Sequence, residues 1–256
     1  MSSSAVIYHI VGTDTDVGKT LATACLASAL EQAGKRVAIY KPAQTGVAPG
    51  QPGDADFAAY LSGARAFEGS RASRPLAPVA AARLDGFTLP SLQEHADRIG
   101  LLTANYDAVI VEGSGGVTVD MAEGEPGSAY SSHNQADLME LLARAGHSAT
   151  TFLVARSGLG TLNHCQLTVS YLNQRNLPVE GIIIGSWPAQ PSYTEESNLR
   201  ALAEMGHRVL ALIPAGLGRG FSAGESNMPS WGADDICEFR ELAYATCRTL
   251  LCNQET

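Results

Sequence analysis

The stretch AVIYHIVGTDTDVGKTLATACLASALEQAG, residues 5–34, decides how this 256-residue chain folds. Its first seven residues form an apolar run typical of a buried β-strand, and the residues from about 18 to 33 follow the pattern of an α-helix. Between them lies GTDTDVGKT, residues 12–20. A loop of this kind binds phosphate, because backbone N–H groups and the positive end of the helix dipole converge on the anion. The stretch therefore predicts a nucleotide-binding strand, loop and helix.

The loop departs from the usual phosphate loop by one residue. Five residues separate Gly12 from Gly18, where the common G-x-x-x-x-G-K-[ST] pattern has four. Lys19 is expected to bridge the β- and γ-phosphates of a triphosphate, and Thr20 to offer its hydroxyl to Mg²⁺. One branch of phosphate-loop proteins, including the partitioning ATPases, has a signature lysine five residues before the loop lysine, where this chain has Asp14. The opposite charge and the short side chain disfavour a switch ATPase of that type.

Further along the chain, apolar runs alternate with helical patterns. The strand candidates are residues 5–11, 36–40, 106–113, 148–155, 181–185 and 207–214. The helix candidates are residues 18–33, 54–61, 92–104, 134–145, 161–174, 195–205 and 234–251. Apolar runs without polar alternation fit parallel strands that helices cover on both faces. We therefore predict an α/β fold: a single phosphate-loop NTPase domain over residues 1–256, with a mostly parallel sheet flanked by helices.

Composition and charge favour small molecules as partners. The formal net charge of -9 and the lack of a Lys/Arg run disfavour nucleic-acid binding, which needs a basic face. No apolar stretch approaches the roughly 20 residues that span a bilayer, so no membrane association is expected. The N-terminal sequence lacks the basic start and cleavage site of a signal peptide, and a cytoplasmic location is expected. The five cysteines are expected to be reduced thiols that mostly pack in the interior: Cys25, Cys165, Cys237, Cys247 and Cys252.

Three more polar clusters follow predicted strands, where α/β sheets place their ligands. KPAQTG, residues 41–46, begins with Lys41, which is expected to stabilise negative charge on a transferring phosphoryl group or a carbonate-derived oxygen. EGSGG, residues 112–116, begins with Glu112, which stands where phosphate-loop enzymes carry a second magnesium-site carboxylate, normally an aspartate. GLGTLNH, residues 158–164, opens a helix whose N-terminus suits an anion, or else a cap that satisfies only its own amides.

In this order and spacing, GTDTDVGKT, KPAQTG, VEGSGG and GLGTLNH resemble the motifs of the dethiobiotin synthetases. The resemblance covers most of the chain. It implies an enzyme that uses ATP and Mg²⁺ to join 7,8-diaminopelargonic acid and CO₂ into dethiobiotin, which contains a cyclic urea. The reaction would pass through a carbamate and a carbamic-phosphoric anhydride. The resemblance also implies a homodimer whose diamine site is completed across the subunit interface by the GLGTLNH segment.

The resemblance implies roles for individual residues as well. The triphosphate would be held by Gly12, Thr13, Asp14, Thr15, Asp16, Val17, Gly18, Lys19 and Thr20, with Glu112 close by. Catalysis would fall to Lys41, Lys19 and Thr45. Mg²⁺ would be bound by Thr20, Glu112 and Asp56; Asp54 is the rival of Asp56, with helix capping as its other role. The diamine would contact Thr45, Gly115, Gly116, Thr161, Leu162 and Asn163.

The predicted base pocket departs from the family pattern. Ser186 and Trp187 follow the apolar run at 181–185, where many members have an asparagine that reads adenine. Trp187 either edges the base pocket or packs beside its neighbouring proline. Pro214 and Ala215 resemble the family's second base-contacting loop and would offer backbone groups. The sequence therefore leaves base selectivity open.

Two other functions compete with this interpretation. A cobyrinate-type amide synthase would use a similar ATP site, but such enzymes usually carry a glutaminase domain with a nucleophilic cysteine, for which this chain leaves no room. A nucleotide switch or metallochaperone would be expected to show a metal-binding Cys/His pair or the signature lysine, and the sequence has neither. The six histidines also lack zinc-site spacing.

Overall fold

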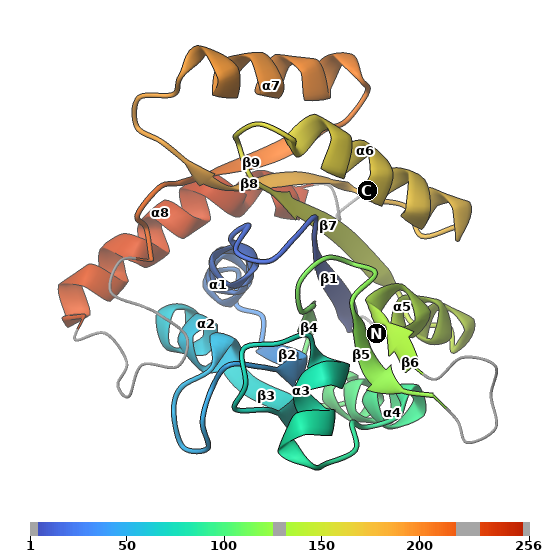
Figure 1. The fold of residues 1–256 in the computed structure, drawn as a ribbon. Helices are drawn as coiled ribbons and strands as arrows, with labels where there is room; N and C mark the ends of the chain where they lie inside the picture. The colour runs from blue at the N-terminus through green and yellow to red at the C-terminus, as the bar shows by residue number, and fades with distance from the viewer. Residues whose placement is uncertain (1–4, 125–131, 219–230, 253–256) are drawn as a thin grey trace.

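Parallel strands form one seven-stranded sheet in the order β3-β2-β4-β1-β7-β8-β9 (Figure 1). The computed structural model describes residues 5–124, 132–218 and 231–252, with the side chains of the last helix described up to residue 248. The strands of this sheet are β1 (Val6–Gly12), β2 (Val37–Gln44), β3 (Arg65–Arg71), β4 (Ala108–Glu112), β7 (Ala149–Ala155), β8 (Gly181–Trp187) and β9 (Val209–Pro214). The short strands β5 (Asp120–Glu123) and β6 (Ser132–Asn134) pair with each other in antiparallel fashion. The predicted α/β fold is confirmed.

Helices cover both faces of the sheet (Figure 1). One face packs against α1 (Lys19–Gln32), α2 (Asp54–Ser62) and α8 (Ala233–Cys252). The other face packs against α4 (Leu92–Thr103), α5 (Gln135–Arg144), α6 (Thr161–Gln174) and α7 (Tyr193–Glu204). The remaining helix of the described chain is α3 (Pro78–Asp85). Every predicted helix is present, with ends that differ from the prediction by at most two residues.

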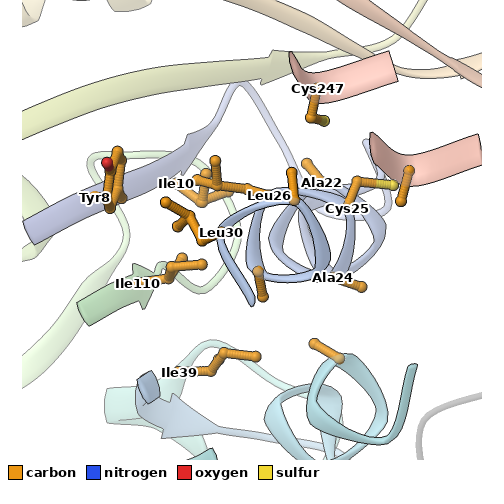
Figure 2. Close-up of a cluster of buried hydrophobic side chains, with 14 of the residues drawn as sticks. Tyr8, Ile10, Ala22, Ala24, Cys25, Leu26, Leu30, Ile39, Ile110 and Cys247 are labelled. Carbon is orange, nitrogen blue, oxygen red and sulfur yellow. The ribbon is translucent and has the colours of Figure 1, made fainter. Parts of the chain in front are cut away.

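The central strand β1 shows why its sequence lacks polar alternation. Tyr8 and Ile10 belong to the core layer beneath α1, whereas Ile7 and Val11 pack in the layers on the opposite face. Successive side chains of a strand point to opposite faces, so a strand buried on both faces is apolar throughout. Figure 2 shows Tyr8 and Ile10 beside the apolar residues of α1. The core therefore fixes the position of the loop that joins β1 to α1.

Two parts of the sheet differ from the prediction. Strand β2 continues through Lys41 and Pro42 to Gln44, because beyond Tyr40 it pairs with β3 and no longer with β4. A proline, which has no N–H to donate, is tolerated where one side of a strand is unpaired. Strand β3 was missed because its sequence, RAFEGSR, is polar and half-buried, as suits an edge strand. Helix α3 and the β5–β6 pair were missed as well.

Within the part of the chain described here, no helix combines the length and the apolar character needed to cross a membrane. Four cysteines are free thiols: Cys25, Cys165 and Cys247 are buried, and Cys237 is exposed. The prediction of reduced thiols that mostly pack in the interior is thus confirmed for the described cysteines, with Cys237 as the exposed exception. The side chain of Cys252 lies outside the described residues.

Candidate active site

The phosphate loop, residues 12–20, leaves the end of β1 and enters α1 at the carboxyl edge of the sheet. Gly18 caps α1 with a φ of 95°, a left-handed conformation that glycine adopts without strain. A Cβ on Gly18 would lie 2.6 Å from the carbonyl oxygen of Gly185 in β8. A Cβ on Gly185 would in turn overlap the carbonyl oxygen of Val17. The loop therefore rests on the backbone of β8, and glycine is required on both sides of the contact.

Lys19, at the first position of α1, is buried with 7% of its surface exposed. Its Nζ donates a hydrogen bond to the carbonyl oxygen of Asp14 at 2.7 Å. Burial, and next the positive charge of Lys41, lower the pKa of Lys19 to about 8. A nearby anion would stabilise the charged form of this amine. The side chain is therefore suited to a phosphate group.

A buried ionic cluster lies beside the phosphate loop. Lys41, in β2, places its Nζ 2.6 Å from Asp54 Oδ2 and 2.8 Å from Glu112 Oε1. Thr20 Oγ1 donates to the same Glu112 oxygen at 2.9 Å. Burial alone would lower the pKa of Lys41, but the two carboxylates outweigh it and raise that pKa; Lys41 likewise lowers the pKa of Asp54 in spite of burial. Lys41 and Asp54 are therefore a charged pair at neutral pH.

The oxygen atoms of this cluster fit Mg²⁺. Glu112 is fully buried, and its Oε2 has no hydrogen-bond partner among the described residues. Such an atom is costly to bury unless a cation or a donor reaches it. Mg²⁺ prefers oxygen ligands and is usually held by one or two carboxylates together with substrate phosphates. The described residues contain no group of three or more His, Cys, Asp or Glu side chains suited to a metal, so a metal here would take further ligands from elsewhere.

The structure gives Asp54 and Asp56 different contacts. Asp56 was preferred for the metal site, but its Oδ2 accepts a hydrogen bond from the Gly53 N–H at 2.9 Å, which caps α2. The same oxygen lies 3.2 Å from Arg71 Nη2. Asp54 is the aspartate that joins the cluster, because its carboxylate reaches Lys41 and its N–H is held by the Gln44 side chain at 2.9 Å.

The glycines after β4 lie against the phosphate loop. A Cβ on Gly12 would lie 2.8 Å from the Gly115 carbonyl oxygen, and a Cβ on Gly116 would lie 3.3 Å from the Thr13 carbonyl oxygen. Gly115 and Gly116 therefore belong to the same edge of the site as the loop. Thr45, which directly follows β2, is half-buried, and its carbonyl oxygen accepts a hydrogen bond from the Gln44 side chain at 3.0 Å.

The helix that the GLGTLNH motif opens is α6. Thr161 is buried and its Oγ1 lies 3.6 Å from Cys165 Sγ, so this hydroxyl is directed into its own helix. Leu162 is half-buried and Asn163 is exposed. Of the three residues of α6 predicted to bind substrate, only Asn163 presents its side chain largely to solvent.

The two predicted base loops meet. The Ala215 N–H donates to the Trp187 carbonyl oxygen at 2.7 Å, which links the end of β9 to the end of β8. Trp187 is half-buried against the core layer beneath α6 and α7, and Ser186 is exposed. Because Gly185 touches the phosphate loop, these loops lie within the reach of a bound nucleotide. Pro214 is the last residue of β9.

Sequence reasoning missed one charged residue at this edge. Arg156 directly follows β7, and its Nη2 lies 2.6 Å from Asp14 Oδ2. Asp14, expected to bind nucleotide, directs its other carboxylate oxygen to the Thr15 N–H at 2.8 Å. The position of Arg156 directly after a buried strand, where α/β sheets place ligand-binding residues, is the signal in the sequence that points to it.

Comparison with known proteins agrees with the geometry. Residues 7–216 match the family model described as AAA domain. The chain is 43% identical over 220 residues to the ATP-dependent dethiobiotin synthetase BioD of Rhodococcus jostii, covering 85% of this chain and 90% of the relative. It is 42% identical over 233 residues to the protein of the same name from Streptomyces avermitilis, covering 88% and 91%.

A solved structure supports the fold alone. The septum site-determining protein MinD of Pyrococcus horikoshii, complexed with Mg-ADP, superposes with a TM-score of 0.51 at 15% identity, covering 93% of this chain and 94% of that chain. By its phosphate loop, its buried Lys41 cluster and its curated relatives, the chain belongs to the family of ATP-dependent dethiobiotin synthetases.

Proposed function

We propose that this protein carboxylates 7,8-diaminopelargonic acid with CO₂ and closes the ring to dethiobiotin, using ATP and Mg²⁺. The observation that carries the proposal is the position of the Lys41 amine, held between Asp54 and Glu112 beside the phosphate-loop residue Thr20. A cation at this place neutralises charge that develops on a transferring phosphoryl group or on a carbamate oxygen. The family membership supplies the substrate.

The proposed reaction has three steps, none of which needs a side-chain nucleophile. One amine of the substrate attacks CO₂ and loses a proton, which gives a carbamate. A carbamate oxygen then takes the γ-phosphoryl group of ATP, which releases ADP and leaves a carbamic-phosphoric anhydride. The second amine attacks the carbonyl carbon of the anhydride, a proton is lost, and inorganic phosphate leaves as the cyclic urea closes. Catalysis then rests on positioning and charge neutralisation.

Residues of the chain can supply both the positioning and the charge neutralisation. Lys19 would move its amine from the Asp14 carbonyl oxygen to the β- and γ-phosphates. Mg²⁺ would be held by Thr20, Glu112 and Asp54, and when bound it neutralises phosphate charge. The backbone of residues 12–18 would cradle the phosphates, and Lys41 with Thr45 would face the carbamate.

The base and the substrate carboxylate would bind on either side of this centre. The base would contact Ser186, Trp187, Pro214 and Ala215. The diamine would lie along Gly115 and Gly116, with its carboxylate at the N-terminus of α6, near residues 161–163, where the first amides of the helix and the helix dipole favour an anion.

A second copy of the chain would complete the diamine site. Leu167 is 61% exposed and lies four residues after Asn163, on the same face of α6. Leu159, in the loop just before α6, is 83% exposed. Exposed large apolar side chains that gather on a surface are typical of an interaction surface. We infer a homodimer that buries this face.

The proposal is tested by incubating the protein with labelled bicarbonate, Mg²⁺, ATP and the diamine, and measuring label in an acid-stable cyclic urea. Label is expected only when all four components are present, and Lys19→Ala is the inactive control. ATP hydrolysis that is independent of the diamine, with no labelled urea formed, would contradict the proposal. ATP-dependent amidation of a carboxylate would instead support a cobyrinate-type synthase, and stimulation by a macromolecule would support a nucleotide switch.

A further inference from the structure

An ion pair joins two loops of the site that lie far apart in the sequence. Arg156 Nη2 lies 2.6 Å from Asp14 Oδ2. Asp14 belongs to the phosphate loop, residues 12–20. Arg156 opens the segment between β7 and α6, residues 156–160, which we call the α6 loop. The first loop is the proposed site of the triphosphate, and the α6 loop leads directly into residues 161–163, the proposed site of the substrate carboxylate.

Asp14 is the centre of the contacts within the phosphate loop. Its carbonyl oxygen accepts from Lys19 Nζ at 2.7 Å, and its carboxylate oxygen Oδ1 accepts from the Thr15 N–H at 2.8 Å. Its second carboxylate oxygen is the one that meets Arg156. The position of Asp14 therefore governs where the Lys19 amine and the loop backbone lie before a nucleotide binds.

The α6 loop is held firmly on its other side by α7. Asn198 donates from Nδ2 to the carbonyl oxygens of Ser157 at 2.9 Å and of Gly158 at 3.0 Å. Ser157 Oγ donates to Glu195 Oε1 at 3.0 Å. Asn198 is buried with 9% exposed, so these bonds are shielded from water. The guanidinium of Arg156 thus extends from an anchored segment to the phosphate loop.

The pair is poorly placed to serve stability alone. The Arg156 and Asp14 side chains are 45% and 49% exposed, and ion pairs at such positions contribute little to folding. An aspartate carboxylate in a phosphate-binding loop would also repel a triphosphate unless a cation neutralises it. Both observations point to a role in ligand binding.

We propose that Arg156 is a positioning residue which, through Asp14, couples the nucleotide site of its own chain to the α6 loop, which in the proposed homodimer completes the diamine site of the partner chain. Binding of either ligand orders one of the two loops, and the ion pair then restricts the motion of the other loop. The second ligand therefore binds more tightly. Arg156 also cancels the charge of Asp14 beside the incoming phosphates. The proposal rests on the proposed function, since it places the diamine carboxylate at α6.

Calorimetry measures the coupling directly. Binding of Mg²⁺ with the non-hydrolysable nucleotide AMP-PCP is titrated with and without saturating 7,8-diaminopelargonic acid, in the absence of bicarbonate. In the parent protein we expect the diamine to tighten nucleotide binding by about fivefold or more, which is the lower end of typical coupling between sites. In Arg156→Gln this factor should fall toward one. Arg156→Lys should keep part of it, because it retains the charge but not the planar fork.

The double variant Asp14→Asn with Arg156→Gln distinguishes the effect of the ion pair on coupling from the separate effects of its two residues. If the two residues act as a unit, the double variant loses no more coupling than Arg156→Gln alone. Arg208→Gln is the matched control, since Arg208 forms an exposed ion pair of the same 2.6 Å length with Glu180 at the opposite end of the sheet. Its melting temperature should match that of Arg156→Gln, and its coupling factor should equal that of the parent.

Steady-state kinetics gives a second measurement. Arg156→Gln should raise KM for both ATP and the diamine while kcat changes by less than KM. Unchanged coupling and unchanged KM values in Arg156→Gln, in a protein that makes dethiobiotin, would overturn the inference and leave the proposed function intact. A parent protein that makes no dethiobiotin would overturn the proposed function, and with it the coupling to the diamine.

Discussion

At the scale of single residues, the site depends on charges that the fold buries in contact with one another. Lys41 is 3% exposed and Glu112 is fully buried, and Lys41 Nζ lies 2.8 Å from Glu112 Oε1. Burying one charge without its partner is strongly unfavourable, whereas Lys41 has two carboxylate partners, Asp54 and Glu112, which raise its pKa in spite of burial. The same arrangement keeps a cation next to the place where phosphate would bind.

Lys41→Met removes the charge but retains much of the apolar stem. We expect ring formation to fall by at least about a hundredfold, because a charge aimed at the transition state is lost, while Mg²⁺-nucleotide binding persists. Single-turnover rates and calorimetry separate the two effects. If binding and chemistry fall by the same factor, Lys41 belongs to the nucleotide site or to the structural framework instead.

The two aspartates of α2 give a paired prediction. Asp54→Asn should raise the Mg²⁺ concentration needed for half-maximal activity, by about tenfold, because a carboxylate of the cluster is lost. Asp56→Asn should leave the Mg²⁺ requirement unchanged and lower the free energy of unfolding by roughly 0.5–2 kcal/mol, because it weakens a helix cap. Activity titrated against Mg²⁺, together with urea unfolding, measures both. The opposite pattern would restore Asp56 as the metal ligand.

Two buried histidines predict how stability depends on pH. Burial lowers the pKa of His9 and of His95 to about 4, below the ordinary value of 6.5. The unfolded chain therefore binds more protons between pH 6.5 and 4, so stability is complete above that window and is lost as the pH falls through it. Each histidine should cost about 2 kcal/mol at pH 5 relative to pH 7.

Urea unfolding at pH 7 and pH 5 checks this expectation. His9→Phe should reduce the loss of unfolding free energy between pH 7 and pH 5 by about 2 kcal/mol, the contribution of one histidine. The reason is that a ring that does not titrate replaces the imidazole that is protonated on unfolding. His207→Gln, at a half-buried position where the ring is hydrogen-bonded to Gln166, is the control and should keep the slope of the parent. Equal slopes in all three proteins would show that His9 does not carry the effect.

At the scale of elements, the phosphate loop takes its shape from a strand that is distant in sequence. Gly185→Ala would place a methyl group against the Val17 carbonyl oxygen. We expect nucleotide affinity to fall by more than about tenfold and stability to fall by about 1–3 kcal/mol, the usual cost of overpacking. Gly100→Ala is the matched control, because its Cβ would meet no atom within 4 Å inside α4.

The control should be neutral or slightly stabilising, since alanine favours a helix over glycine. Calorimetry with Mg²⁺ and AMP-PCP, together with urea unfolding, reports on both variants. Parent-like nucleotide affinity in Gly185→Ala would mean that the loop does not depend on its contact with β8.

At the scale of the whole molecule, the proposed homodimer predicts complementation between two inactive chains. Asn163→Asp puts a negative charge beside the proposed carboxylate site, so diamine affinity should fall while ATP binding stays near normal. Mixed with Lys19→Ala under conditions that exchange subunits, it should restore activity if each site draws Lys19 from one chain and Asn163 from the other. Such a mixed dimer has one site with both defects and one with neither. A mixture as inactive as its parents, with exchange confirmed, would rule out the shared site.

The sequence by itself determined the features that depend on local chemistry. The apolar run of β1, the glycines of the loop and the residues Lys19 and Thr20 predict a nucleotide loop, because backbone freedom and the helix dipole act over a few residues. The placement of Lys41 and Glu112 at the carboxyl edge of the sheet also followed, since parallel strands gather their ends there.

Only the tertiary structure decided the choices that depend on distant partners. Asp54 and Asp56 stand two residues apart in the first turn of α2, and successive residues turn by about 100° around a helix, so the two side chains point to different neighbours. Asp54 contacts Lys41 and joins the buried cluster, whereas Asp56 contacts Arg71 and caps α2. The polar edge strand β3 and the meeting of Asp14 with Arg156 likewise depend on which strands lie side by side, because pairing between remote segments leaves no local pattern in the chain.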